Sequence, residues 1–230
     1  MTSNQYKDGQ YLQKTGGTWH REDSPFKAGE VLRMLDRSGL RPKTICEVGC
    51  GAGGILAELR KSLPAETELV GYEISPQAHE LSKPSAGGNL SFLLADPFED
   101  VATFDLVLVM DVIEHVEDTF AFLRKCRRKG AHKLYHIPLD VTCLSAIRDS
   151  PLTSWRQLGH LHCFSVGTAL EALRYTDHRI LDHFLTASAL AARGGLKRKI
   201  ANAGRLLLGK LSRKLSQRIW GGYSLMVLCE

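Results

Sequence analysis

The feature that most constrains this chain is a glycine-rich turn placed directly after a short apolar run. Residues Thr44–Val48 have the length and apolar character of a buried strand, and Gly49, Gly51, Gly53 and Gly54 follow at once. Apolar residues at helical spacing come next. Glycine permits positive φ and close approach of the backbone to a bound molecule. The order strand, glycine turn, helix therefore predicts a ligand-binding unit.

The same alternation of strand and helix continues along the chain. Strands are predicted at 44–48, 68–74, 90–94, 104–110, 133–137, 179–185 and 223–229. Helical patterns lie between them, and Ser165 is a predicted N-cap for a helix reaching Tyr175. Crossovers of a dozen or more residues favour parallel pairing. We therefore expect an α/β fold, with a seven-stranded, mostly parallel, doubly wound sheet.

Four of the predicted strands end at or near a glycine turn or an acid. These residues are Gly49, Glu73, Asp96 and Asp111. In open α/β sheets, ligands bind beyond the carboxyl ends of the strands. We therefore expect these four positions to face one binding crevice.

Charge around the glycine turn distinguishes between possible ligands. Glu47 lies two residues before Gly49, and residues 44–59 contain no lysine or arginine. A dinucleotide brings a pyrophosphate, which favours neutral or positive surroundings. The acidic strand ends instead favour a cationic ligand with free ribose hydroxyls and no phosphate. S-adenosylmethionine fits this description better than NAD does.

Five motifs carry a resemblance to a known family. They are Glu47-x-Gly-x-Gly-x-Gly53, Val70-Gly-Tyr-Glu73-Ile-Ser75, Leu93-Leu-Ala-Asp96, Phe104-Asp-Leu-Val-Leu-Val-Met-Asp111-Val-Ile-Glu-His115-Val, and Gly159-His-Leu-His-Cys-Phe-Ser165. In this order they resemble the class I S-adenosylmethionine-dependent methyltransferases, in the group that includes ubiquinone-biosynthesis and tailoring O-methyltransferases. The resemblance spans about Thr44 to Tyr175 plus the closing strand pair, and it implies a Rossmann-like fold.

The resemblance also implies roles for individual residues. The glycine loop would pack against the methionine portion of the cofactor, and Glu73 would accept hydrogen bonds from both ribose hydroxyls. Asp96 would contact the adenine amino group, or else cap the turn that follows it. The implied cofactor-binding residues are Glu47, Gly49, Gly51, Gly53, Glu73, Ile74, Asp96, Met110 and Asp111.

Histidines supply the candidate catalytic groups. His115 is the predicted general base for a hydroxyl acceptor, because it follows the fourth strand; alternatively it only packs beside the cofactor. His136, His160 and His162 are further candidates, of which at most one is expected to be catalytic. His20 belongs either to a lid over the cofactor or to an ordered surface loop.

A metal-binding alternative involves the same region. Asp111-x-x-Glu114-His115 with a later histidine resembles the magnesium-binding set of small-RNA 2′-O-methyltransferases, which carry glutamate where this chain has Asp111. Glu114 is more simply an acid at a helix start, where it complements the helix dipole. The sequence alone assigns no metal ion.

Positive charge is confined to one segment near the end. Residues 188–228 contain nine basic and no acidic residues, whereas the rest of the chain has 21 basic against 25 acidic. Apolar residues at steps of three or four predict one amphipathic helix over 195–220. Its apolar stripe would pack on the domain with solvated bases; alternatively the helix caps the active site, lies on an anionic membrane or, least favoured, touches nucleic acid.

The predicted organisation is a lead-in and covering helix over 1–43, a core over 44–187, the basic insertion over 188–220 and a final strand over 221–230. The polar N-terminus and the lack of a long apolar run predict a cytoplasmic protein, with a peripheral position on the inner face of a membrane as the alternative. The predicted function is S-adenosylmethionine-dependent O-methylation of a small molecule or glycan. The alternatives are an RNA 2′-O-methyltransferase and a non-catalytic cofactor-binding module.

Overall fold

The computed structural model describes residues 18, 19, 21–99, 101–187 and 205–230. Its strands form a seven-stranded sheet in the order β3-β2-β1-β4-β5-β7-β6. The predicted α/β sheet is therefore confirmed, and every predicted strand is present. The strands are β1 (Thr44–Val48), β2 (Glu68–Glu73), β3 (Leu90–Leu94), β4 (Phe104–Met110), β5 (Gly130–Pro138), β6 (Ile180–Thr186) and β7 (Ser224–Cys229).

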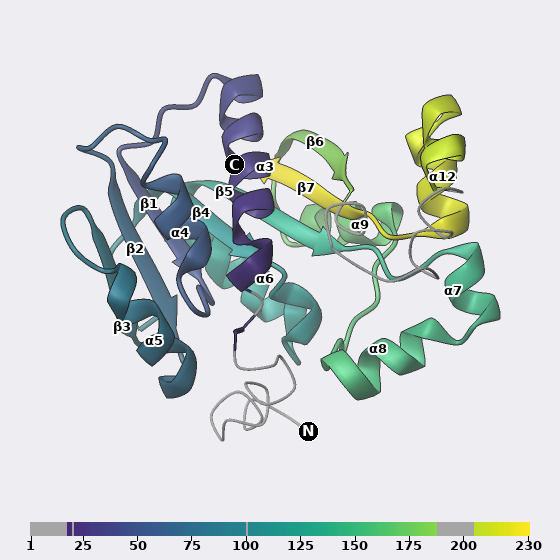
Figure 1. The fold of residues 1–230 in the computed structure, drawn as a ribbon, viewed down its shortest axis with the longest axis horizontal. Helices are drawn as coiled ribbons and strands as arrows, with labels where there is room; N and C mark the ends of the chain where they lie inside the picture. The colour runs from purple at the N-terminus through teal and green to yellow at the C-terminus, as the bar shows by residue number, and fades with distance from the viewer. Residues whose placement is uncertain (1–17, 20, 100, 188–204) are drawn as a thin grey trace. The chain divides into compact units, whose positions relative to one another are not determined.

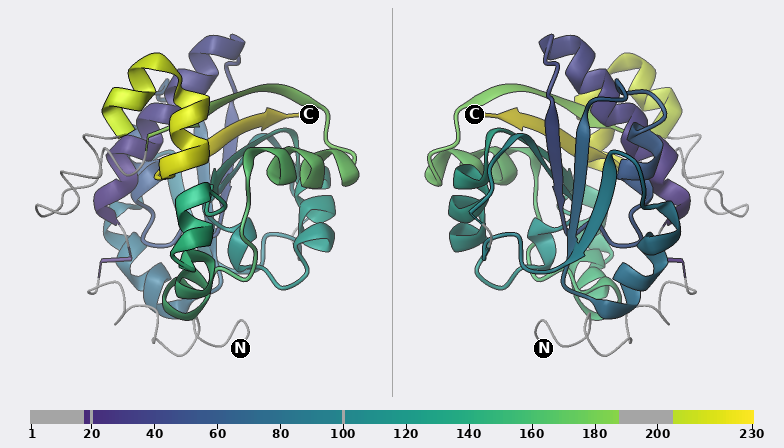
Figure 2. Two further views of the ribbon diagram at one scale, coloured as in Figure 1. Left: turned by 90° about the vertical axis from the view of Figure 1, so that its right-hand side faces the viewer. Right: turned by 90° about the vertical axis from the view of Figure 1, so that its left-hand side faces the viewer.

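The chain divides into two compact units. The first contains residues 1–110 and 124–134. In it, β1 pairs in parallel with β2 and β4, and β2 pairs in parallel with β3. Helices α3 (Ser24–Ser38), α4 (Gly54–Leu59) and α5 (Pro76–Ser82) lie on one face of these strands (Figure 1 and Figure 2). The strand order reverses at β1, because its two parallel partners lie on opposite sides.

Local sequence accounts for the ends of these helices. The first turn of α3 contains a proline, and the helix ends at Gly39 with φ of 70°. Helix α5 begins with Pro76 after Ser75, whose side chain accepts a hydrogen bond from the backbone N–H of Ala78. Both starts use proline where a helix has no internal partner for its N–H, and the glycine end uses the left-handed conformation.

The second unit contains residues 111–123 and 135–229. Strands β6 and β7 pair antiparallel, and the helices are α7 (Cys143–Ile147), α8 (Ser150–Leu158), α9 (Val166–Tyr175) and α12 (Arg213–Trp220). The predicted cap at Ser165 is confirmed: its side chain and that of Thr168 each bond to the other's backbone N–H. Helix α6 (Thr119–Lys129) contributes residues to both units.

Short 3₁₀ turns complete the described elements. They are η1 (Arg21–Asp23), η2 (Lys83–Ser85) and η3 (Ile113–His115). No helix within 18–19, 21–99, 101–187 or 205–230 is long and apolar enough to cross a membrane.

The predicted basic helix over 195–220 is wrong in one respect. Residues 188–204 lie outside the described part of the chain, but 205–211 are helical and the helix stops at Ser212. Ser212 has extended backbone angles and caps α12 by accepting from the N–H of Leu215. A serine that bonds to the backbone in this way starts a new helix and does not extend the old one. The segment is therefore not one continuous helix.

The favoured interpretation packed the apolar stripe of this segment on the domain, and three described leucines of that stripe contradict it. Leu207, Leu211 and Leu215 are 69%, 85% and 47% exposed. Ser216 and Gln217 are buried instead. The hydroxyl of Ser216 bonds to the carbonyl of Arg205 and accepts from Tyr223, so the polar side of α12 has partners inside the unit. Leu207, Leu211 and Leu215 therefore face outward.

Candidate active site

The glycine loop is tied to the end of β2. The backbone N–H groups of Gly49 and Cys50 both donate to the carbonyl of Tyr72, at 2.9 and 3.0 Å. Gly49, Gly51 and Gly53 have φ of 71°, 55° and 70°. These left-handed conformations are costly for residues with a Cβ, so the sequence needs glycine at all three positions.

Close packing adds a second requirement for glycine. A Cβ on Gly51 would lie 2.6 Å from Trp19 Cδ1, and one on Gly53 would lie 2.4 Å from Phe92 Cζ. The indole of Trp19 therefore packs directly against the loop. Trp19 was not among the predicted site residues, although its chain neighbour His20 was a candidate; His20 lies outside the described residues.

Glu73 organises the loop from the end of β2. Its Oε2 accepts from the N–H of Gly51 at 2.8 Å, and its Oε1 accepts from Ile74 and Ser75 at 2.9 and 2.8 Å. Burial raises the pKa of the Glu73 carboxyl above its usual range, and the three backbone bonds oppose that shift. A carboxylate offers about four acceptor sites, so these bonds leave room for roughly one more donor.

Glu47 is a buried acid at the base of the same loop. Glu47 is only 1% exposed, and its Oε2 forms no hydrogen bond within the described part of the chain. Burial raises the pKa of Glu47 to about 8; Lys27 lowers it and Glu73 raises it. A buried acceptor without a hydrogen bond is costly, and a cationic donor would satisfy it. The loop thus fits the amino group of S-adenosylmethionine.

Three other predicted cofactor residues lie in the same unit. Asp96 Oδ1 accepts from the N–H of Phe98 at 2.9 Å, so the capping role considered for Asp96 is present. That bond leaves Oδ2 for an adenine amino group. Ile74 follows β2 and is 42% exposed, whereas Met110 ends β4 and is buried.

Asp111 starts the second unit, in a backbone conformation uncommon outside glycine. Its φ is 57°, its N–H donates to the carbonyl of His136, and its Oδ1 lies 2.5 Å from His136 Nδ1. The other ring nitrogen of His136 bonds to Thr186 Oγ1 at 2.9 Å. Both ring nitrogens of His136 are therefore occupied. The ring orients Asp111 and is not a base for an acceptor.

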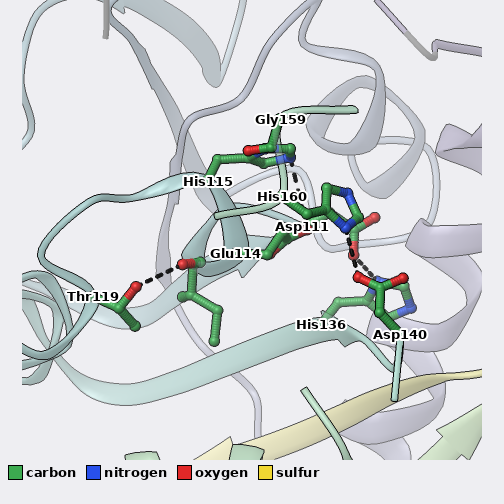
Figure 3. Close-up of polar contacts among 9 residues, drawn as sticks. Asp111, Glu114, His115, Thr119, His136, Asp140, Gly159 and His160 are labelled. Carbon is green, nitrogen blue, oxygen red and sulfur yellow. Dashed lines mark hydrogen bonds and ion pairs between the residues drawn. The ribbon is translucent and has the colours of Figure 1, made fainter. Parts of the chain in front are cut away.

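A cluster of three ionisable side chains forms around η3. Glu114 and His115 come from the turn itself, and His160 comes from the loop after α8 (Figure 3). His115 Nδ1 lies 3.1 Å from the carbonyl of Gly159, and His160 Nδ1 lies 2.6 Å from Asp140 Oδ2. The two imidazoles meet edge to face, with ring centroids 4.9 Å apart.

His115 is neutral at physiological pH. Burial, together with the neighbouring His160, lowers the pKa of His115 to about 4, against smaller opposing effects of the Gly159 carbonyl, Asp111 and Asp140. A carbonyl can only accept, so Nδ1 carries the ring proton and Nε2 carries the lone pair. His162 plays a different part: its Nε2 donates to the carbonyl of Val116 at 2.9 Å and fixes the loop.

The sequence placed Glu114 and His115 in one candidate set with a later histidine, but it did not select His160 as that histidine and did not indicate Asp140. The segment around Asp140 held no readable motif. The sequence does contain one indication of α8: Pro151 in its first turn and Gly159 at its end are typical of the two ends of a helix. That helix returns the chain so that His160 reaches His115.

Comparison with known proteins identifies the family. Residues 19–192 match the family model described as "Methyltransferase domain". Norajmaline N-methyltransferase of Rauvolfia serpentina is 32% identical over 114 residues, covering 44% of this chain and 38% of that protein. Ubiquinone biosynthesis O-methyltransferase of Vibrio parahaemolyticus is 31% identical over 123 residues, covering 49% and 50%. The matched segments thus span half or less of these relatives.

Solved structures share the fold. Magnesium protoporphyrin IX methyltransferase from Synechocystis, determined with bound S-adenosylhomocysteine, superposes with a TM-score of 0.59 at 15% identity, covering 89% of this chain and 82% of that one. A putative sarcosine dimethylglycine methyltransferase from Galdieria sulphuraria gives 0.63 at 15% identity, covering 96% and 97%. The chain therefore belongs to the methyltransferase domain family, and it shares the fold of these methyltransferases.

Proposed function

We propose that this methyltransferase acts on a hydroxyl oxygen of a small molecule or glycan, with His115 as the residue that engages that hydroxyl. The observation that carries the proposal is the neutral imidazole of His115, whose Nδ1 is fixed by Gly159 and whose Nε2 keeps its lone pair. An amine acceptor needs no base once it is neutral, whereas a hydroxyl must lose a proton during transfer.

The glycine loop supplies the cofactor side of the proposal. S-adenosylmethionine provides an electrophilic methyl group on a sulfonium centre. Glu47 would pair with its amino group, and the remaining acceptor site of Glu73 would bind a ribose hydroxyl. Asp96 Oδ2 would accept from the adenine amino group. Trp19, packed on Gly51, would shield this end of the cofactor from water.

His115 would hold the acceptor through its Nε2. With its fixed tautomer, the ring would accept a hydrogen bond from the acceptor hydroxyl and take its proton on Nε2 as that oxygen receives the methyl group. His160 lies edge-on to His115 and restricts the orientation of that ring. Positioning of this kind supplies much of the rate enhancement in a substitution at carbon.

Transfer of a labelled methyl group tests the proposal. Matched acceptors that differ only in hydroxyl or amine should be labelled on oxygen, and His115→Ala should lower kcat/KM by about 10²–10⁴. S-adenosylhomocysteine affinity should stay within twofold, and the exposed His183→Ala serves as the control. Labelling of amines alone would refute the choice of oxygen. Labelling of RNA 2′-hydroxyls in preference to small molecules would favour the RNA alternative.

A second proposal concerns location: residues 205–218 would contact an anionic membrane surface. The exposed leucines support it, because Leu207, Leu211 and Leu215 lie in a stretch that also carries Lys210 and Lys214. Apolar side chains flanked by bases partition into the interface of an anionic bilayer. Such contact would suit a lipid-linked acceptor, and vesicle binding tests it.

A further inference from the structure

We propose that Glu114, His115 and His160 bind a divalent transition-metal ion, and that the acceptor oxygen completes its coordination. One carboxylate oxygen and one nitrogen from each ring all lie within 4.8 Å of one another (Figure 3). The role given to the acceptor oxygen rests on the proposed function, whereas metal binding itself does not. With the ion bound, the acceptor hydroxyl engages the metal in place of His115.

The tautomer of His115 determines which ring nitrogen can bind a metal ion. Gly159 offers only a carbonyl oxygen, so the proton of the neutral ring lies on Nδ1. Nε2 therefore keeps its lone pair, and Glu114 Oε1 lies 3.8 Å from it. The Glu114 side chain is fully buried, and that of His115 is 15% exposed. A carboxylate and a nitrogen with a lone pair thus lie together at a largely buried position.

His160 is oriented by a carboxylate on its far side. Asp140 Oδ2 lies 2.6 Å from His160 Nδ1, which directs Nε2 away from Asp140. A histidine that binds a metal usually donates its other ring N–H to a carboxylate or carbonyl. That bond fixes the orientation of the ring and increases the basicity of the ligand nitrogen. Asp111 and Asp140 also act electrostatically on His115, so further negative charge surrounds the cluster.

Backbone hydrogen bonds hold the two halves of the cluster together. The N–H groups of Leu161 and His162 donate to the carbonyl of Glu114, at 2.7 and 3.1 Å. The loop that carries His160 is thus attached to the turn that carries Glu114. Ligands on one ion stand about 3.4 Å apart for bonds of about 2.1 Å in a tetrahedron. Side-chain rotations that move the ligand atoms by about 1 Å would bring them to these separations without moving this backbone.

The donor set indicates which ion would bind. Mg²⁺ and Ca²⁺ prefer oxygen ligands throughout, whereas two imidazoles and one carboxylate suit Zn²⁺, Mn²⁺ or Co²⁺. Three protein ligands also leave a coordination position open, as in catalytic zinc sites. The predicted set also contained Asp111, which is bonded to His136 instead, and His160 is the later histidine that the sequence left open.

The chemistry of the bound ion follows from this open position. A divalent ion lowers the pKa of a coordinated hydroxyl, so the acceptor proton passes to water. The resulting oxygen anion forms the new O–C bond as the C–S bond breaks. The sulfonium becomes a neutral thioether, and charge is balanced.

Calorimetry on untagged, EDTA-dialysed full-length protein tests the inference. We expect one Zn²⁺ or Mn²⁺ per chain, with weaker binding of Mg²⁺. Glu114→Gln and His160→Ala should each weaken the metal affinity at least tenfold, and Asp140→Asn about tenfold through the orientation of His160. The exposed His183→Ala is the matched control and should bind as the wild type does. No stoichiometric binding to the wild type, or equal binding by all variants, would overturn the inference.

Two further measurements distinguish loss of the metal site from loss of the fold. Addition of Co²⁺ to the wild type should give visible d–d absorption of a site with nitrogen ligands, which needs no variant to fold; the absence of such bands would count against the site. S-adenosylhomocysteine affinity is measured in parallel in the metal-free protein. Metal binding without methyl transfer to any hydroxyl would leave the metal site standing and refute the proposed function alone.

Discussion

The glycine loop and the histidine cluster are built in opposite ways. The shape of the loop comes from three glycines close in sequence with positive φ, and a single carboxylate, that of Glu73 at the end of the next strand, accepts three backbone N–H bonds. The histidine cluster is formed by side chains from Glu114 and His160, far apart in sequence, and each ring is oriented by a separate acceptor. The conformation of the glycine loop is therefore specified mainly by local sequence, whereas the histidine cluster depends on tertiary folding.

The largest expected effect concerns the buried acid beneath the glycine loop. The folded protein keeps the Glu47 proton up to a pKa of about 8, whereas the unfolded chain releases it near 4.5. The free energy of unfolding therefore falls as pH rises from 4.5 to 8, by at most about 1.4 kcal/mol per pH unit. Urea unfolding of the cofactor-free protein between pH 5 and 8 measures this slope.

Glu47→Gln isolates the contribution of Glu47, because the pKa of its neighbour Glu73 is raised in the same direction. The variant should have a shallower slope than the wild type. Binding of S-adenosylhomocysteine at pH 7 should also release a proton, which calorimetry in buffers of different ionisation enthalpy detects. Equal slopes for the two proteins would show that Glu47 is ionised in the folded state.

The second prediction concerns the order of the loop itself. Glu73→Ala removes an acceptor from three backbone N–H groups and from the proposed ribose contact. Each bond to a charged group is worth about 1.5–3 kcal/mol, so S-adenosylhomocysteine affinity should fall at least about a hundredfold. The exposed Glu66→Ala is the control. A loss below tenfold would mean that Glu73 neither orders the loop nor contacts the cofactor.

Local specification explains why the sequence predicted this unit so closely. The bounds of β1, β3 and β4 agree with the predicted strands residue for residue, because each is a mainly apolar run with a glycine or an acid within two residues of its end. The cap at Ser165 was predicted for the same reason, since capping depends on a serine and a residue three positions later.

The features that the sequence did not predict depend on contacts between residues that a hydrophobic pattern does not show. Helices α7 and α8 were missed because their apolar residues Ile147, Leu152 and Trp155 are largely exposed and give no buried face. The break at Ser212 was missed because the leucine spacing continues through it, while the serine bonds to the backbone of Leu215. The partnership of Asp140 with His160 depends on the turn that follows α8.

The third prediction asks whether the second unit also contributes to cofactor binding. His136→Phe keeps a ring of similar volume but removes the nitrogen that orients Asp111. If Asp111 contacts the cofactor, S-adenosylhomocysteine affinity should fall about tenfold, the loss of one hydrogen bond. Thr186→Val disturbs only the other ring nitrogen and should bind normally. Unchanged affinity in both variants would restrict the cofactor site to the glycine-loop unit.

The smallest effect on the fold is expected where the leucines face outward. Because Leu207 and Leu211 are 69% and 85% exposed, replacing both by glutamine should change the free energy of unfolding by only about 0.5 kcal/mol or less. The same change should lower binding to anionic vesicles about tenfold or more, since each leucine contributes apolar area to the interface.

The control for this double variant is Leu152→Gln, which changes an exposed leucine on α8 outside the basic segment. It should bind vesicles as the wild type does, and neither protein should bind neutral vesicles strongly. A double variant that binds like the wild type would remove the membrane proposal. A double variant that unfolds would show instead that these leucines are packed in solution, and the contrast drawn for this segment would fail. Only loss of vesicle binding with the fold intact supports a surface selected for contact outside the molecule, because stability then gives no reason for leucine at these positions.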